Sequence, residues 1–424
     1  MARRSFSHFF ADTRPLRNQH FRRLWVANII TVIGAQLTVV AVPAQLYADT
    51  GSSAYVGLAG VFGLVPLIVF GLYGGALADV FDRRTILIIT TVGLIVTSGL
   101  FWLQAAAGNT NVWLLLSLFS VQQAFFAVNQ PTRSAVLPKL LDLSLLPAAN
   151  SLNTTVMMAG AIAGPMVAGV LIPVIGFKWM YLIDSFTLLA TLGAVVRLPS
   201  LRVVDAASTT PGVRAIVDGL VYLRTQPVLL MSFVVDLIAM VFGMPRALFP
   251  ETAHLSFGGP DNGGIVFALL FAAIPAGAVI GGVFSGWVSR VERQGLAVVV
   301  CILFWGAAMT GFGVAISLAD HWQTPMLLAA LFALVIGGAA DTASASFRST
   351  MLQSAGDDAM RGRLQGVFIV VVAGGPRIAD VLHGSTAAAI GPGPAAAGGG
   401  VLVLVGVVIA AIAVPSFVRY RVSR

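Results

Sequence analysis

Long, nearly uninterrupted runs of apolar residues dominate the chain, and short polar or Gly- and Pro-rich segments separate them. A helix that crosses the ~30 Å hydrocarbon core of a membrane needs roughly 20 mostly apolar residues. Strands of a membrane barrel would be about ten residues long, with strict alternation of side chains. The pattern therefore predicts transmembrane helices, at 24–47, 54–78, 86–106, 112–130, 151–174, 179–197, 227–250, 264–288, 296–318, 324–347, 363–390 and 396–418.

The composition supports a membrane protein and excludes several other classes. Of the 424 residues 58% are hydrophobic and only 10% are charged, against about 25% charged in a typical soluble domain. A soluble enzyme and a disordered chain are both incompatible with this balance. The single cysteine excludes a disulfide framework, and the five histidines are scattered, so we expect no metal site. There is no ATPase-type phosphate-binding loop, and we expect no cofactor.

The basic residues indicate the topology. If both termini are cytoplasmic, only Lys178, Arg246 and Arg377 of the 25 lysines and arginines fall away from the cytoplasmic side. In this arrangement Arg133 and Lys139 lie in the loop after span 4, and Arg348 lies near the loop after span 10. The net charge of +8 is then a topology signal, and we expect no nucleic-acid partner. We expect a multi-pass protein of a bacterial inner membrane.

The sequence also contains an internal repeat. Three pairs of segments align at nearly one offset: GGALADVFDR at 74–83 with GGVFSGWVSR at 281–290, Gly164-Pro165 with Gly375-Pro376, and Arg133-Ser134 with Arg348-Ser349. The repeat predicts an all-α membrane protein whose twelve helices form two pseudo-symmetric six-helix bundles, with a substrate site between them near the bilayer midplane. The expected divisions are a tail at 1–23, bundles at 24–197 and 227–418, a linker with an amphipathic helix at 198–226, and a tail at 419–424.

The segment GGALADVFDRR, at 74–84, ends span 2 and enters a cytoplasmic loop. Gly75 permits close helix packing. Asp79 can accept hydrogen bonds from the N-terminus of a neighbouring helix, where the helix dipole favours negative charge. With Arg83 and Arg84 these residues form a candidate conformational latch that breaks when the two halves rock apart. The alternative is an ordinary basic loop with an incidental acid.

This segment resembles the loop signature of the major facilitator superfamily. LRNQHFRRLW at 16–25, AVNQPTRSAVLPKLL at 127–141 and MLQSAGDDAMRGRLQGVF at 351–368 further resemble its enterobactin-exporter branch. The resemblance implies two bundles around a central cavity, alternating access, and export of siderophores or drugs by proton antiport. The second copy of the motif departs from the pattern, since it has Gly286 where the first has Asp79.

Span 5 contains AGAIAGPMVAG, at 159–169, which resembles the antiporter motif of exporting members of the superfamily. Its candidate residues are Gly160, Gly164, Pro165 and Gly169. Small residues allow tight packing, which we expect against a helix of the other half, and Pro165 bends the helix. The alternative is a common Gly-rich packing face.

Ionisable residues inside the spans are candidates for proton coupling, because buried charge in a membrane is costly. The candidates are Asp236, Asp341, Arg377 and Asp380. Burial favours a protonated acid, and a nearby arginine favours the ionised form. In the competing interpretation Asp236–Arg246 and Arg377–Asp380 are permanent structural pairs.

Two further ionisable residues lie inside spans. Asp184, near the outer start of span 6, fits an interfacial anchor. Asp380 can reach His383 on the same helix face, but a lone histidine is more often a satisfied polar residue than a proton relay.

Polar and aromatic residues in the spans are candidates for substrate contact. They are Gln36, Gln122, Gln123, Phe242 and Arg246, and the adjacent Gln122 and Gln123 cannot both face one cavity. The expected partners are a small-molecule substrate, protons and the lipid bilayer, and we expect a monomer. A multidrug pump without a siderophore role, a proton-coupled importer and an intramembrane enzyme stay open as alternatives.

Overall fold

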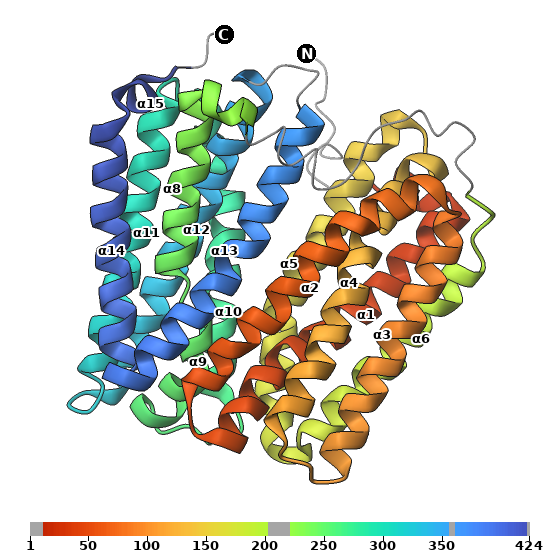
Figure 1. The fold of residues 1–424 in the computed structure, drawn as a ribbon, viewed down its shortest axis with the longest axis horizontal. Coiled ribbons are helices and arrows are strands. Elements are labelled where there is room, and N and C mark those ends of the chain that lie inside the picture. The colour runs from red at the N-terminus through yellow and green to blue at the C-terminus, as the bar shows by residue number, and fades with distance from the viewer. Residues whose placement is uncertain (1–11, 202–220, 356–360, 422–424) are drawn as a thin grey trace, which may run out of the picture.

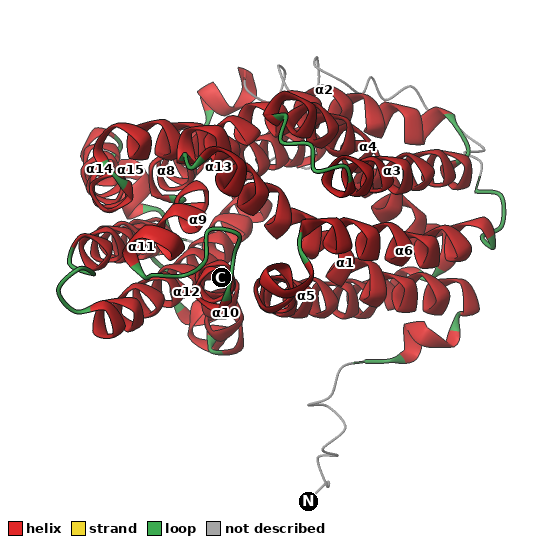
Figure 2. Ribbon diagram, turned by 90° about the horizontal axis from the view of Figure 1, so that it is seen from below, coloured by secondary structure: helices red, strands yellow, loops and turns green. Residues whose placement is uncertain are grey.

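The computed structural model describes residues 12–201, 221–355 and 361–421, and of 72–80, 289, 353–355 and 361–370 it describes the backbone alone. Helices form two bundles that lie side by side (Figures 1 and 2). The first bundle contains α1 (Gln19–Thr50), α2 (Ser53–Val80), α3 (Arg83–Ala106), α4 (Val112–Leu140), α5 (Leu146–Ile175) and α6 (Phe177–Val196). The second contains α8 (Pro227–Gly243), α9 (Phe249–Glu251), α10 (Ile265–Val283), α11 (Gln294–Ser317), α12 (Gln323–Ala355), α13 (Arg361–Ile390) and α14 (Pro392–Ala413), and α15 (Pro415–Arg419) follows.

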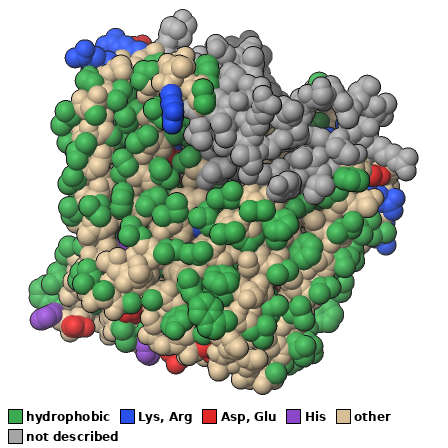
Figure 3. All heavy atoms as spheres, in the orientation of Figure 1, with side chains coloured by type: hydrophobic (Ala, Val, Ile, Leu, Met, Phe, Trp, Pro, Cys, Tyr) green, Lys and Arg blue, Asp and Glu red, His purple; other side chains and the backbone are tan. Residues whose placement is uncertain are grey.

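The helices are long and apolar enough for a membrane protein. In the described residues, eleven helical segments meet the length and hydropathy of a membrane span. The remaining expected span corresponds to α13, whose 30 residues are enough to cross a bilayer. Hydrophobic side chains cover much of the surface seen in Figure 3, while lysines and arginines show mainly at its upper left and at its right edge. The chain is therefore an all-α, multi-pass membrane protein.

Two helices extend well beyond the apolar runs that predicted them. The fourth span was expected to end near residue 130, but α4 continues to Leu140, and α12 continues past 347 to Ala355. Arg133 and Lys139 therefore lie in a helix rather than a loop, and Arg348 lies in α12 with 6% of its side chain exposed. Hydropathy marks the boundary of lipid, whereas backbone hydrogen bonds and caps determine where a helix ends.

The seventh span is broken. The helix α8 ends at Gly243, and Met244 has an extended backbone conformation (φ −94°, ψ 102°). Pro245 follows, and a proline disfavours helical geometry in the residue before it. A short 3-10 turn at Arg246–Leu248 and a π-helical turn at Thr252–Ser256 complete the segment. The break turns Arg246 toward the interface between the bundles.

The two bundles contact each other at the end opposite the termini. Near this end, the backbone of α13 lies against Gly57 and Gly60 of α2, and Gly169 of α5 lies against Ala268 of α10. Any side chain at these glycines would overlap the neighbouring helix, so small residues allow the close approach. The bundles diverge toward the end where the chain termini lie (Figure 1).

The linker expected at 198–226 lies mostly outside the described residues. Its first residues pack against the first bundle, where Leu198 and Leu201 are buried beside Leu24 and Val136. The expected amphipathic helix falls largely on 202–220.

Candidate transport site

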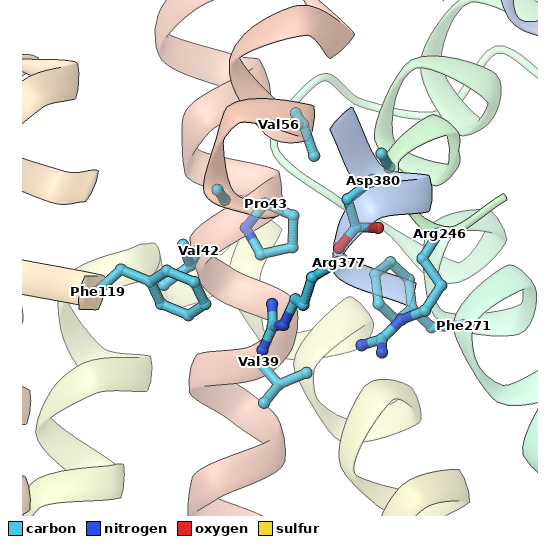
Figure 4. Close-up of a pocket in the computed structure, with 11 residues that line it drawn as sticks. Val39, Val42, Pro43, Val56, Phe119, Arg246, Phe271, Arg377 and Asp380 are labelled. Atoms are coloured by element: carbon cyan, nitrogen blue, oxygen red, sulfur yellow. The ribbon is translucent and has the colours of Figure 1, made fainter. Parts of the chain in front are cut away.

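A small cavity lies between the bundles at the break in span 7. It encloses about 50 Å³. The first bundle contributes residues of α1, α2 and α4, and the second contributes the turn after α8, α10 and α13. The lining residues are Val39, Val42, Pro43, Val56, Ala59, Phe119, Arg246, Ala247, Phe271, Arg377 and Asp380 (Figure 4).

Arg377 connects the two bundles at this cavity. Its Nη2 donates a hydrogen bond to Oε1 of Gln123, at 3.2 Å, and its guanidinium lies 5.4 Å from the centre of the Phe119 ring. Both partners belong to α4, while Arg377 belongs to α13. The adjacent Gln122 points elsewhere, and its Nε2 donates to Oγ of Ser98 at 3.3 Å inside the first bundle. The two amides thus diverge, as adjacent positions on a helix must.

Arg246 and Asp380 complete the charged wall of the cavity. The guanidinium of Arg246 lies 5.8 Å from the centre of the Phe271 ring. The carboxylate of Asp380 lies between the two arginines in Figure 4. None of the ion pairs among the described residues joins Asp380 to Arg377 or Asp236 to Arg246. The structural pairs considered from the sequence are therefore wrong, and two cations and one acid face a shared space.

The partner of Asp236 is Arg348. These side chains form an ion pair between α8 and α12, with 2% and 6% of their surfaces exposed. A second acid, Asp341, lies 3.8 Å from Nη2 of Arg348 and is one-third exposed. The hydropathy pattern did not place Arg348 in a helix, because this residue lies just beyond the apolar run of span 10. The repeat alignment of Arg348 with Arg133 was a signal that it occupies a matching place in a helix.

His383 has a structural contact at the break in span 7. Its ring Nε2 lies 2.9 Å from the carbonyl oxygen of Phe242, and the histidine is 3% exposed. Because α8 ends at Gly243, this carbonyl lacks the amide four residues later that an unbroken helix would provide. An Nε2–H tautomer satisfies it. Phe242 itself is half-buried and is not among the residues that line the cavity.

Asp184 is buried inside the first bundle, so the prediction of an interfacial anchor is wrong. It is 2% exposed, and its Oδ2 accepts hydrogen bonds from Thr38 at 2.7 Å and Ser98 at 2.8 Å. Its Oδ1 has no hydrogen-bond partner among the described residues. The network continues through Ser98 to Gln122, and it links α1, α3, α4 and α6. Hydrogen bonds alone hold the Asp184 carboxylate in this network, since no cation among the described residues pairs with it.

The glycines of span 5 pack mostly within their own bundle. A side chain at Gly160 would meet Val32 of α1, and one at Gly164 would meet Gln36 of α1. Of the three glycines, Gly169 faces the second bundle. The expected packing against the other half is therefore wrong for Gly160 and Gly164, because α5 packs against α1 at these two positions. Gln36 is part of this helix contact and does not line the cavity.

The candidate latch is only partly within the described residues, since only the backbone of Gly75 and Asp79 is described. Nη1 of Arg83 donates to the carbonyl oxygen of Ala135 at 3.0 Å, and Nη2 of Arg84 donates to that of Val196 at 2.6 Å. Both contacts tie the start of α3 to the ends of neighbouring helices in the first bundle.

Sequence reasoning missed the adjacent Asp82. Its carboxylate accepts from the backbone N–H of Arg84 at 2.9 Å and caps α3. It also accepts from Oγ of Ser200 at 2.6 Å and from the backbone N–H of Leu201 at 3.1 Å. An aspartate one residue before a helix was a capping signal.

A charged cavity between two six-helix bundles is the arrangement of a secondary transporter. A family model described as transmembrane secretion effector, of the MFS_3 family, matches residues 10–420. The chain belongs to this family, and thus to the major facilitator superfamily. It is 27% identical over 398 residues to the enterobactin exporter EntS of Escherichia coli O1:K1 / APEC, covering 92% of this chain and 90% of that protein. The same values relate it to the enterobactin exporter EntS of Shigella boydii serotype 18.

Solved structures of transporters share the fold. A single-residue mutant of the nucleoside transporter NupG aligns with a TM-score of 0.74 at 11% identity over 94% of this chain and 99% of that one. A POT family transporter in complex with 5-aminolevulinic acid aligns with a TM-score of 0.75 at 12% identity, over 94% and 97%. At such identities the likeness concerns the fold alone.

Proposed function

We propose that this transporter exports a small organic molecule in exchange for protons. The observation that carries the proposal is the cavity at the bundle interface, where Arg246, Arg377 and Asp380 share one wall. The family description and the names of the enterobactin exporters support outward transport. A multi-pass transporter with ionisable side chains at its bundle interface needs no catalytic group, so transport explains the site better than an intramembrane reaction.

Both termini face the cytoplasm of a bacterial inner membrane in this proposal. The gathering of basic side chains at the terminal end supports this orientation. The contacts at Gly57, Gly60 and Gly169 then close the periplasmic side, and the structure corresponds to a state that opens inward. The bundles at 24–197 and 227–418 rock as units in a monomer. Gly75, Asp79, Arg83 and Arg84 act as the cytoplasmic latch.

The substrate is a siderophore or a drug-like compound that carries acidic groups. Two arginines and one aspartate give the cavity wall an excess of positive charge when all three are ionised. Guanidinium groups form strong paired hydrogen bonds with carboxylates and other oxyanions. The rings of Phe119 and Phe271 add aromatic surface beside these cations.

Asp380 and Asp236 are the first candidates for the proton, and Asp341 is the next. Asp380 lies between the cavity arginines, so substrate anions and Asp380 compete for the same cations. Asp236 lies in a second cluster with Arg348 and Asp341, which bridges α8 and α12. A shift of one helix against the other would separate Arg348 from one of its acids, and an acid without its cation favours the protonated form.

Proteoliposomes with an imposed proton gradient test the proposal. We expect the wild type to concentrate substrate against its own gradient, and neutralising the coupling acid in Asp236→Asn or Asp380→Asn to abolish this. Substrate exchange that needs no net proton movement should survive. Uphill transport by both variants would place the coupling site elsewhere, and gradient-driven movement in the opposite sense would identify an importer.

The substrate class has its own test in cells. Cells that lack the transporter and wild-type cells are compared under iron limitation for retained compounds. Accumulation of a siderophore in the deletion strain supports a siderophore exporter. Unchanged siderophore with increased drug sensitivity identifies a multidrug pump instead.

A further inference from the structure

An exposed groove on the first bundle combines an arginine cluster with an apolar floor. It lies between α1 and α6 at the terminal end and encloses about 440 Å³. Its lining residues include Arg22, Arg23 and Arg197 at the rim, and Ile30, Leu189 and Gly193 along the floor. The groove shares no residue with the transport cavity.

Among the described residues, the charges that line the groove are all positive and have no acidic partner. Arg22 and Arg23 lie in the first turns of α1, and Arg197 is the C-cap of α6, so the antiparallel helices bring them to one end. No acid lines the groove, and none of the ion pairs or side-chain hydrogen bonds of the described residues involves these three guanidinium groups. The site therefore attracts an anion.

The floor of the groove extends from these arginines into the membrane. Ile30 follows Arg22 by eight residues and Leu189 precedes Arg197 by eight residues, which places each about 12 Å deeper along its helix. Val26, Ile30 and Leu189 are 43–47% exposed. The Cβ of any residue at Gly193 would enter open space. An apolar floor of this depth could hold the acyl chain of a lipid, and the cationic rim could hold its charged headgroup.

A neighbouring groove provides a contrast. It lies at the same end between the N-terminal segment and α4, and Arg14, Arg17, Lys139 and Asp142 are among its lining residues. There Arg14 is paired with Asp12 at 2.6 Å, and the lining also contains an acid, Asp142. Basic residues alone thus do not distinguish the two grooves; the uncompensated charge and apolar depth do.

We propose that the groove between α1 and α6 binds one anionic phospholipid of the adjacent leaflet. Arg22, Arg23 and Arg197 hold the phosphodiester, and an acyl chain lies along Ile30, Leu189 and Gly193. Basic pockets between membrane helices have the chemistry to bind anionic headgroups. The transport cavity is also lined by α1. A lipid in the groove would therefore hold the N-terminal end of α1 against α6 while the bundles move.

Native mass spectrometry of the purified protein in mild detergent tests the proposal. The probes are dioleoylphosphatidylglycerol, dioleoylphosphatidylcholine and inorganic phosphate. We expect the first phosphatidylglycerol to bind more tightly than phosphatidylcholine, and each Arg→Gln change at 22, 23 or 197 to weaken it by about fivefold. Equal binding of the two lipids, or unchanged phosphatidylglycerol binding by the triple Arg→Gln variant, would overturn the proposal. Competition by millimolar inorganic phosphate would identify a free-anion site instead.

A second variant separates the acyl chain from the headgroup. Gly193→Leu fills the floor and keeps the three arginines, so it should weaken phosphatidylglycerol binding without altering the charge. Gly99→Leu is the matched control, since Gly99 of α3 also borders open space and lies outside the groove. Arg17→Gln in the neighbouring groove is the charge control. Normal lipid binding by Gly193→Leu, with melting temperatures unchanged, would contradict a chain-binding floor.

Discussion

Arg348 of α12 and Asp236 of α8 form a buried ion pair that joins two helices of the second bundle, with Asp341 as a second acid close to the same guanidinium. Removing either member of the pair leaves an uncompensated buried charge, which typically costs about 3–5 kcal/mol. We therefore expect Arg348→Ala to lower the melting temperature of the purified protein and to lower transport. The double variant Asp236→Asn, Arg348→Gln should recover much of the stability. If it also recovers uphill transport, the pair is structural and Asp236 does not couple protons.

Arg377 is expected to set the pH range of transport through Asp380. Without the guanidinium, the ionised form of Asp380 loses a neighbouring cation, so a higher pH is needed to release its proton. Arg377→Ala should therefore shift the pH optimum of gradient-driven transport upward. Gln123→Leu is the matched control, because it removes the hydrogen bond of Arg377 to α4 and keeps the charge. An optimum that stays in place in Arg377→Ala would mean that Asp380 does not respond to this cation.

The latch prediction concerns Asp79. Asp79→Asn keeps the shape of the side chain but loses the charge that interacts with a helix N-terminus, an interaction of about 0.3–1 kcal/mol at exposed sites and more when partly buried. We expect a folded, inserted protein with strongly lowered transport in vesicle assays. Arg83→Ala should behave similarly. Normal transport by a well-expressed Asp79→Asn protein would contradict the latch hypothesis. A severe defect in one variant alone would show that Asp79 and Arg83 do not act as a unit.

The polar network of the first bundle should respond differently to two changes at Asp184. Asp184→Asn retains an oxygen that can accept from Thr38 and Ser98, so thermal stability should change little. Asp184→Leu leaves these buried hydroxyls unpaired, at about 1–3 kcal/mol for each group left unsatisfied. The melting temperature should fall clearly for Asp184→Leu. Loss of proton-driven transport in a stable Asp184→Asn protein would move proton coupling into the first bundle.

The close approach of α2 and α13 should depend on Gly60. Gly60→Val places a branched side chain against the backbone of Arg377, and overpacking of this kind costs about 1–3 kcal/mol. The closed contact between the bundles should become less populated, so transport falls while expression stays normal. Gly71→Val is the control on the same helix, because Gly71 borders open space. Distances between spin labels on α2 and α13 would report the change, and equal distances in both variants would contradict it.

The sequence by itself determined the architecture. Its apolar runs predicted the helices, because a membrane-spanning helix needs about twenty apolar residues and barrel strands would be shorter and alternating. The repeat and the loop motif predicted two bundles of the major facilitator type, and the fold and family matches confirm that class. The distribution of charge showed which acids and arginines are candidates, since ionisable residues are rare inside spans.

Only the tertiary structure decided the partners. Pairing within one helix follows from spacing, which is why Arg377 and Asp380 were considered together. Asp236 instead meets Arg348, more than a hundred residues away, because α8 and α12 pack side by side and α12 extends past its apolar run. The same holds for Asp184, which hydropathy placed at an interface and packing placed among Thr38 and Ser98. A hydropathy pattern is read from neighbouring residues along the chain. Ion pairs and hydrogen bonds between helices depend on distances in the folded protein, which no local pattern contains.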